Sequence, residues 1–427
     1  MSARFTGLWQ HKDFVRLWAG ETVSVFGTLI GQMAMLFTAI LWLDASPLQV
    51  SILSACQIVP AFVGGLAAGV WVDRLPRRPI LILADGGRFV ALATIPAAAL
   101  FHVLTIEQLF VVALVTSGLG VFFDVAYEAY LPTLVAREEL VEGNSKLTAS
   151  ASAAEFASFS LSGWLVQILS APGAVLVDAL SFLASAFAIW RIRTPEPRPL
   201  GGIERQHIVR EALEGIGLVA REPILRSLAL ANALAVSGSR IIGVVFLLYL
   251  DRELGFSPGI LGMIFAVGGL TSLGGAFLAG RAEWFGGLGT ALVVAAFVRA
   301  GGTLFMPLAA SASLAGALLL VANQLVTDPA WTFYDITTVS LRQAITLDRL
   351  QGRMSATMRF VEFGAMLLGT AAGGIGGEWV GLREMLFAAV GLQLLAACLL
   401  AISPVRHLRR LPRRGDPGDS LLPAAGV

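Results

Sequence analysis

The chain has 427 residues, of which 56% are hydrophobic and 14% are charged, and its mean hydropathy is +0.77. Soluble domains carry roughly 25% charged residues, so this composition excludes an ordinary soluble domain and indicates that lipid surrounds most of the chain. The net charge of +1 argues neither for nor against a nucleic-acid partner, and we expect none.

Long apolar stretches without alternation follow one another along the chain. In lipid only helices and closed barrels satisfy their backbone groups, and the lack of alternation favours helices. The apolar pattern is weakest in the fifth stretch, which is rich in Ala and Ser, and in the tenth, which ends in WTFYDITTVS. The sequence predicts an all-α membrane protein with twelve spans, near 17–42, 50–72, 79–101, 108–130, 147–169, 174–192, 225–250, 258–280, 288–308, 313–336, 354–377 and 382–403.

The distribution of Lys and Arg predicts the orientation. If the N-terminus is inside, the inner segments hold 24 of the 30 Lys and Arg residues, whereas the outer loops hold only Arg252 and Arg383. Basic residues concentrate in cytoplasmic loops, and a different number of spans would scramble this alternation. We therefore expect a multi-pass protein of the bacterial inner membrane with both termini in the cytoplasm.

The spans divide into two sets of six. We expect an N-terminal six-helix bundle over 1–192 and a C-terminal one over 225–404. Between them, 193–224 is a predicted cytoplasmic linker whose segment HIVREALEGIGLVARE reads as an amphipathic helix on the membrane surface. The basic tail over 405–427 is rich in Pro and Gly at its end, which predicts disorder.

The two sets also resemble each other as repeats. LVEGNSKLTASASAAEF in the fifth span is similar to LQGRMSATMRFVEF in the eleventh. Arg88 and Arg299 each lie in the third span of their set, 211 residues apart, and Glu155 and Glu362 are 207 residues apart. These nearly constant offsets suggest two pseudo-symmetric bundles that arose by duplication.

The most specific string, GVWVDRLPRR, follows the second span. It resembles the signature loop of the major facilitator superfamily, G-x-x-x-D-R-x-G-R-R, although Pro76 stands where that family usually has Gly. The resemblance implies the major-facilitator fold with twelve transmembrane helices. It also implies a loop that takes part in the conformational switch, formed by Gly69, Asp73, Arg74, Arg77 and Arg78.

A second resemblance narrows the branch. VFFDVAYEAYLPTLVAREELVEGNSKL, together with FVRLWAGETVSVFG near the N-terminus, looks like the macrolide-efflux and transmembrane-secretion-effector branch of that superfamily. The resemblance implies proton-coupled antiport that exports a small hydrophobic or amphipathic molecule, such as a drug, a siderophore or a secondary metabolite. Two features depart from the branch: Thr28 replaces an acid in the first span, and SFSLSGWL replaces a Gly-Pro-rich antiporter motif in the fifth.

Ionisable residues within spans are costly in lipid and usually face a cavity or a partner. The superfamily arrangement implies that spans 1, 4, 7 and 10 surround a central cavity and that spans 3, 6, 9 and 12 pack outside. The proton-coupling candidates are Glu155, Glu362, Glu21 and Asp328. The substrate-cavity candidates are Arg240, Arg359, Asp124, Glu128, Tyr127, Trp331 and Tyr334.

Each candidate also has a purely structural explanation. Arg240 lies near the middle of its span and requires either a carboxylate in an ion pair or a bound anion. Arg359 and Glu362 are three residues apart on one helix face and can pair with each other. Asp85, Arg88 and Arg299 belong to the outer spans, so we interpret Asp85 and Arg88 as a structural pair and Arg299 as structural.

No catalytic constellation is visible, so we do not expect an enzyme. Cys56 and Cys398 lie in apolar runs, and no metal site or cofactor is predicted. The expected partners are the small-molecule substrate, protons and membrane lipids, and we expect a monomer. Two alternatives remain open: a lipid or lysophospholipid flippase on the same fold, and a membrane sensor or assembly partner that does not transport.

Overall fold

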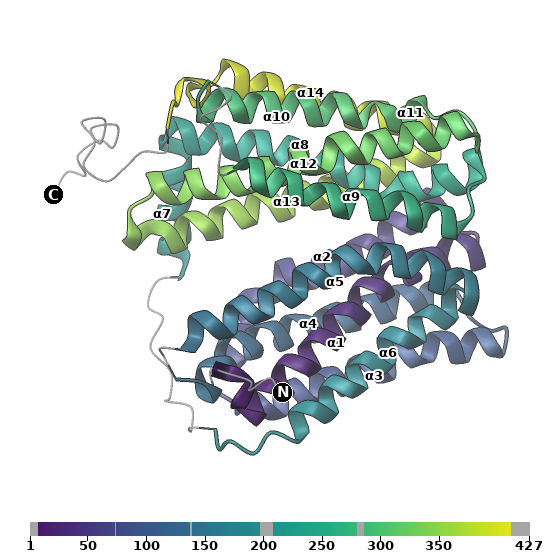
Figure 1. The fold of residues 1–427 in the computed structure, drawn as a ribbon, viewed down its shortest axis with the longest axis vertical. Helices are drawn as coiled ribbons and strands as arrows, with labels where there is room; N and C mark the ends of the chain where they lie inside the picture. Colours follow the sequence, from purple (N-terminus) through teal and green to yellow (C-terminus); the bar gives the residue numbers. More distant parts are fainter. Residues whose placement is uncertain (1–6, 73, 137–138, 197–207, 280–285, 411–427) are drawn as a thin grey trace, which may run out of the picture. The chain divides into compact units, whose positions relative to one another are not determined.

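The structure is a computed structural model that describes residues 7–72, 74–136, 139–196, 208–279 and 286–410. Within these ranges there is no strand, and twelve helices have 16 residues or more, so the predicted all-α class is confirmed (Figure 1). The first six are α1 (Lys12–Phe37), α2 (Pro47–Val72), α3 (Arg77–Leu100), α4 (Ile106–Leu134), α5 (Leu140–Leu169) and α6 (Ala171–Trp190). The second six are α8 (Pro223–Leu248), α9 (Pro258–Ala279), α10 (Leu288–Thr303), α12 (Leu314–Ile345), α13 (Gln351–Trp379) and α14 (Leu382–Ile402).

Shorter helical segments connect or extend these helices. Two π-helical turns continue α1 and α8, and an amphipathic helix joins the two sets of six. The short segments are η1 (Gly7–Gln10), η2 (Thr38–Trp42), α7 (Ile208–Arg221), η4 (Tyr249–Leu254), α11 (Phe305–Leu308), η6 (Asp348–Leu350) and η7 (Pro404–His407).

Ten helices in the described ranges are long and apolar enough to cross a membrane. The two long helices that do not meet this criterion, α5 and α12, are the two spans with the weakest apolar pattern. With 30 and 32 residues they are nonetheless long enough to span. Both extend beyond their predicted bounds, since α5 begins seven residues before 147 and α12 ends nine residues after 336. The additions are polar segments that prolong the helix beyond the apolar stretch from which a span is predicted.

The chain divides into two compact units. The first unit is Met1–Glu204 with Ser257–Ala266, and the second unit is Arg205–Phe256 with Val267–Val427. In the first unit α1 packs on α6 and α5, α3 packs on α6 and α4, and α2 packs on α4 (Figure 1). In the second unit α8 packs on α14 and α13, and α10 packs on α12 and α14. The two units therefore repeat one pattern of helix contacts.

The amphipathic helix α7 packs onto the second unit, against α13 and α8. A Cβ atom on Gly215 would lie 2.6 Å from the carbonyl oxygen of Arg353, so only glycine allows α7 to approach α13 this closely. The side chain of Glu214 pairs with that of Arg353, and Val219 is buried with Met354. A helix expected in the linker is thus held against the bundle.

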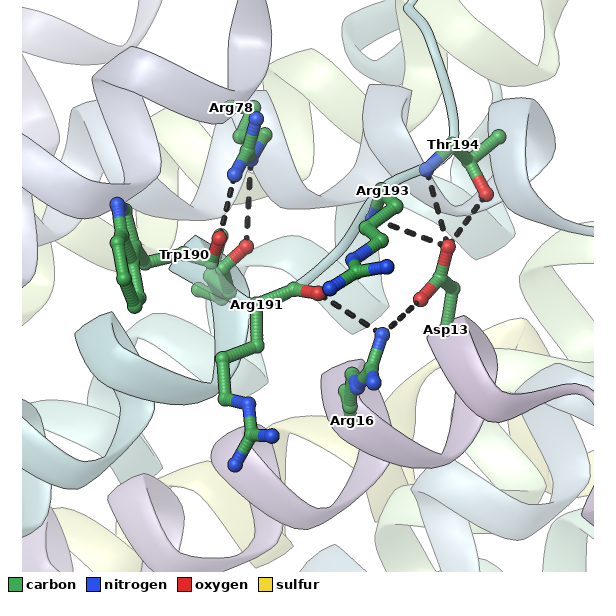
Figure 2. Close-up of polar contacts among 8 residues, drawn as sticks. Asp13, Arg16, Arg78, Trp190, Arg191, Arg193 and Thr194 are labelled. Carbon is green, nitrogen blue, oxygen red and sulfur yellow. Dashed lines mark hydrogen bonds and ion pairs between the residues drawn. The ribbon is translucent and has the colours of Figure 1, made fainter.

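At one end of the first unit, Asp13 and Arg16 of α1 hold the segment that follows α6 (Figure 2). The Asp13 carboxylate accepts hydrogen bonds from the backbone N–H groups of Arg193 (3.1 Å) and Thr194 (3.0 Å) and from Thr194 Oγ1 (2.7 Å). Arg16 donates to Asp13 (2.6 Å) and to the carbonyl oxygen of Arg191 (2.8 Å). These contacts fix the chain where it leaves α6.

Two arginines of the predicted switch loop contribute to the same end. Arg78 donates to the carbonyl oxygens of Ile189 (3.3 Å) and Trp190, at the C-terminus of α6, where a positive charge is favourable (Figure 2). The carboxylate of Glu196 accepts from the backbone N–H groups of Arg77 (2.7 Å) and Arg78 (3.2 Å) and so caps the N-terminus of α3. We call Asp13, Arg16, Arg77, Arg78 and Glu196 the clasp.

We expect Asp13→Ala to loosen the segment after α6. The substitution removes three hydrogen bonds from that segment to a charged acceptor. A hydrogen bond of this kind contributes about 1.5–3 kcal/mol to stability. Trypsin should therefore cleave after Arg193 several-fold faster in the purified variant, as followed by mass spectrometry. Glu107→Ala, an exposed carboxylate in the first turn of α4, is the control and should leave the cleavage rate unchanged. Equal rates in the two variants would contradict the clasp.

Candidate functional site

The first unit contains a cavity of about 340 Å³ that is built from α1, α2, α3, α4 and α6. Its apolar wall includes Val25, Leu29, Met35, Leu92, Phe123 and Phe182. Its polar lining includes Thr28, Gln32, Gln57, Thr116 and Ser117. Four ionisable side chains also line it: Glu21, Arg88, Asp124 and Asp178. We call this space the Arg88 cavity.

Arg88 is buried, with 7% of its surface exposed, and is held from three sides. Its Nη2 atom donates to Asp85 Oδ1 at 2.8 Å, and Asp85 is completely buried. The guanidinium also lies over the rings of Phe123 and Phe182, at 4.4 and 4.3 Å from their centroids. Cation–π contacts of this kind strengthen where water is excluded. The geometry therefore fixes the guanidinium firmly in one place.

The charges around Arg88 do not balance. Besides Asp85, the carboxylates of Glu21, Asp124 and Asp178 are near enough to interact electrostatically with its guanidinium. Glu21 Oε2 is buried without a hydrogen-bond partner among the described residues, whereas Asp85 lies near the hydroxyl of Ser185 in addition to Arg88. A buried charge without a partner is strongly unfavourable. One guanidinium facing four carboxylates thus leaves a site that favours an additional positive charge or protons.

Small residues on α1 make room for the buried aspartate of α6. A Cβ atom on Gly31 would lie 2.0 Å from Asp178 Oδ2, and one on Gly27 would lie 1.9 Å from Ser181 Oγ. Ser181 donates to the carbonyl oxygen of Asp178 (2.7 Å). Asp178 is 5% exposed, and it reaches the cavity because α1 has no side chain at these two positions.

The structure brings four of the predicted residues together. Glu21 and Asp124 both line the Arg88 cavity. The hydroxyl of Tyr127 is buried without a partner among the described residues and is near enough to interact with Glu21, and its ring stacks on Phe123 at 5.8 Å. Glu128 is exposed one turn from Asp124 and interacts with it electrostatically.

Other candidates lie elsewhere. Glu155 is exposed on α5 and does not line the cavity. In the second unit, Arg240 donates to Met366 Sδ (3.5 Å) and interacts electrostatically with Glu362 of α13. Arg359 is exposed, and no ion pair joins it to Glu362 in the described part of the chain. Glu362 therefore interacts with Arg240 of α8 and not with Arg359 of its own helix.

The candidates on α12 surround Arg299 of α10. Trp331 lies under the Arg299 guanidinium at 4.2 Å and stacks with Tyr334 at 6.4 Å. Tyr334 is buried in the core of the second unit. Asp328 lies against Gly268 of α9 and interacts electrostatically with Arg299.

The switch loop is partly described. Gly69 lies in the last turn of α2, and Asp73 lies outside the described residues. Arg74 is exposed, whereas Arg77 and Arg78 belong to the clasp.

Sequence reasoning missed part of this site. The predicted pair of Asp85 and Arg88 exists, and Arg88 also lines the cavity, which its place in an outer span did not predict. Asp178 was not singled out, although it interrupts the apolar run VLVDALSF in the sixth span, a sufficient signal. Among the described residues, no group of three His, Cys, Asp or Glu side chains is arranged to hold a metal ion.

Comparisons with known proteins agree with this architecture. Residues 22–370 match the Major Facilitator Superfamily. The chain is 24% identical to the uncharacterized MFS-type transporter YfiS of Bacillus subtilis, over 92% of this chain and 93% of that one. It is 26% identical to macrolide efflux protein A of Streptococcus pyogenes (53% and 55% of the chains) and 28% identical to the multidrug efflux pump Tap of Mycolicibacterium fortuitum (45% and 48%).

Solved structures show the same fold at lower identity. A bacterial homologue of the iron transporter ferroportin, in its inward-facing state, aligns with a TM-score of 0.72 and 16% identity, over 93% of this chain and 99% of that one. The nucleoside transporter NupG aligns with a TM-score of 0.70 and 12% identity, over 91% and 98%. At such identities the likeness concerns the fold alone.

Proposed function

The chain belongs to the Major Facilitator Superfamily, whose members are transporters and not enzymes, and we propose that it exports a small hydrophobic or amphipathic molecule in exchange for protons. The export direction is supported by the two efflux proteins that match about half of the chain. The proposed mechanism is alternating access in the bacterial inner membrane, with both termini in the cytoplasm.

The observation that carries the proton coupling is the charge imbalance of the Arg88 cavity. Of the four carboxylates near Arg88, only Asp85 is hydrogen-bonded to it, which leaves Glu21, Asp124 and Asp178 as the proton acceptors. Asp178 is buried and Glu21 is half-buried, whereas Asp124 is exposed. Burial favours the neutral form of a carboxylate, so proton uptake at Asp178 and Glu21 would stabilise the substrate-free state. Each proton that leaves to the cytoplasm restores a negative charge.

Coupling requires that protons and substrate favour opposite states of the transporter. Protons from outside would neutralise the carboxylates and release the substrate, and their loss to the cytoplasm would allow a new substrate molecule to bind. A ligand shifts such an equilibrium only by its differential affinity for the two states. The carboxylates provide this difference because their charge changes while the surrounding apolar wall does not.

The test is transport by the purified protein in proteoliposomes. We expect a fluorescent amphipathic probe, rhodamine 6G, to move against its gradient when an inward proton gradient is imposed and to stop when an ionophore collapses that gradient. Glu21→Gln should abolish gradient-driven movement. If flux does not depend on the gradient, the antiport proposal is wrong. If Glu155→Gln abolishes it and Glu21→Gln does not, the proton site lies on α5 and not in the Arg88 cavity.

The same proteoliposomes test the two alternatives. A flippase would move a fluorescent lysophospholipid between leaflets in an assay where rhodamine 6G does not move. A membrane sensor or assembly partner would move neither molecule. Either result would replace the export proposal.

A further inference from the structure

Arg240 of α8 carries a charge near the middle of a membrane span without a strong hydrogen-bond acceptor. The span runs over Pro223–Leu254. The guanidinium donates to the Sδ atom of Met366 at 3.5 Å, and a thioether sulfur accepts only weakly. Glu362 interacts with it electrostatically, but no carboxylate of the described residues lies within ion-pair distance of it. A charge at this depth requires a partner, and the described residues provide only a distant one.

Two other arginines inside the spans are held more firmly. Arg88 donates to a buried carboxylate and lies against two aromatic rings. Arg299 donates to Ser239 Oγ at 2.6 Å, and its guanidinium lies 4.2 Å from the centroid of Trp331. Among the described residues, neither an oxygen acceptor nor a ring holds Arg240 in this way. An arginine that the fold holds so loosely within a span is suited to a ligand rather than to packing.

The side of α8 that carries Arg240 is open. Arg240 is partly exposed, and Gly243, one turn further along α8, is exposed with no atom within 4 Å of a Cβ atom built on it. On α13, Arg359, Glu362 and Met366 follow one another at spacings of three and four residues and so share a face. This face of α13 meets Arg240 through Met366. Two guanidiniums and one carboxylate therefore border one side of the second unit, which leaves a net positive charge there.

The first unit packs its equivalent helices without an arginine at this place. Gly27 and Gly238, which are 211 residues apart, mark the close approach of α1 to α6 and of α8 to α14. In the same register Leu29 corresponds to Arg240. The shared packing thus forms with an apolar side chain at this position, so it does not require the charge of Arg240.

We propose that Arg240 binds the carboxylate of an amphipathic organic acid, so that the exported molecules include acids whose charged group is held in the second unit. This assignment rests on the proposed function and names a substrate class for it. A guanidinium and a carboxylate form two parallel charge-assisted hydrogen bonds, which supply the partner that Arg240 requires. Glu362 lies near enough to compete with the ligand for the same guanidinium. Met366 provides an adaptable apolar wall for the hydrocarbon part of the ligand.

The test uses two dyes, rhodamine 19 and its ethyl ester rhodamine 6G, which differ only in whether one carboxyl group is free. Their binding to the purified full-length protein in a non-ionic detergent is measured by fluorescence anisotropy at neutral pH, with protein-free detergent as the baseline. We expect rhodamine 19 to bind about tenfold or more tightly than rhodamine 6G. Equal affinity for the two dyes would overturn the proposal.

Variants on α8 separate Arg240 from the general positive charge of the helix. Arg240→Gln should abolish the preference for the free acid and leave rhodamine 6G binding unchanged, whereas Arg240→Lys should retain part of the preference because the charge remains. Arg226→Gln is the matched control, since Arg226 is an exposed arginine of the same helix, and it should keep the full preference. An equal loss in Arg226→Gln and Arg240→Gln would overturn the assignment.

The neighbouring carboxylate gives a variant with the opposite sign. Glu362→Gln should strengthen rhodamine 19 binding several-fold, because the competing carboxylate is then neutral. If Arg240 and Glu362 served only as a structural ion pair, Glu362→Gln would lower the unfolding temperature without strengthening rhodamine 19 binding, and the proposal would be wrong. Unfolding temperatures also verify that every variant is folded.

A lipid headgroup is another source of an anion, and phosphatidylglycerol is the probe for it. Added phosphatidylglycerol should displace rhodamine 19 no better than phosphatidylcholine does. Selective displacement by phosphatidylglycerol would assign Arg240 to a lipid phosphate and overturn the substrate class.

These measurements separate the inference from the function on which it rests. Binding in detergent involves no gradient, so a preference for the free acid would stand even if the proteoliposomes showed no proton-driven flux. Conversely, proton-driven movement of rhodamine 6G together with equal binding of the two dyes would preserve the proposed function and refute the substrate class.

Discussion

Replacing Arg88 with Ala should destabilise the first unit by about 3–5 kcal/mol, the cost of removing one partner from a buried ion pair. Asp85 is completely buried, its Oδ1 atom accepts the hydrogen bond from Arg88, and beside Arg88 only the neutral hydroxyl of Ser185 stabilises its charge among the described residues. Without the guanidinium, Glu21, Asp124 and Asp178 also lose the one positive charge that lines the cavity among the described residues. The unfolding temperature in detergent, followed by intrinsic fluorescence, measures the effect.

Two further variants separate the loss of charge from the loss of volume. Arg88→Ala combined with Asp85→Asn should recover much of the stability, since the buried carboxylate is then neutral. Arg299→Ala is the matched control. It removes one hydrogen bond to Ser239 and the contact with Trp331, but it leaves fewer carboxylates without a nearby positive charge than Arg88→Ala does. If Arg299→Ala were as harmful as Arg88→Ala, charge imbalance would not be the reason for the effect.

The sequence predicted the helical class, the number of long helices and their approximate bounds because membrane spans depend on one local property, the length of an apolar run. The two weakest apolar runs lie in α5 and α12, and these are the two long helices that are not apolar enough to count as candidate membrane spans among the described residues. Their polar residues lower their mean hydropathy. Which helices pack together was predictable only through the family resemblance, because no local pattern specifies it.

The candidate site was predicted less completely. Sorting residues by the span that carries them identified Glu21 and Asp124 as cavity residues. The same sorting placed Arg88 on an outer span, and Asp178, also on an outer span, was not considered. A helix that packs outside its bundle still turns one face inward. The face is set by close approach to neighbours, here by Gly27 and Gly31 of α1, and this approach cannot be derived from the position of a residue along the chain.

The resemblance of the two halves shows which charged residues occur in both units and which occur in the first unit alone. Arg88 and Arg299 were recognised as counterparts from their spacing, yet the same spacing leads to Ala296 and Ala389 where the first half has Asp85 and Asp178. The two halves therefore share an arginine in the same register but differ in the acids that surround it, since Asp328 and Asp335 are the carboxylates that interact with Arg299.

Gly31→Val should abolish efflux and lower the stability of the first unit. The Cβ atom would lie 2.0 Å from Asp178 Oδ2 and 2.6 Å from Asp178 Cβ, and the second contact cannot be relieved by rotation of the carboxylate alone. Overpacking of this kind typically costs about 1–3 kcal/mol. Because Asp178 lines the Arg88 cavity, the displacement also changes the site itself. Unfolding temperature and rhodamine 6G efflux measure the two effects.

The control is a glycine of the same unit with open space around it. Nothing lies within 4 Å of a Cβ atom at Gly86 of α3, one residue after Asp85. Gly86→Val should therefore leave both stability and efflux nearly unchanged. If Gly31→Val were as stable as the unchanged protein, α1 and α6 could move apart without a loss of stability. The glycines of α1 would then not explain why Asp178 is buried. Normal efflux in a less stable Gly31→Val variant would mean that Asp178 is needed for packing and not for transport.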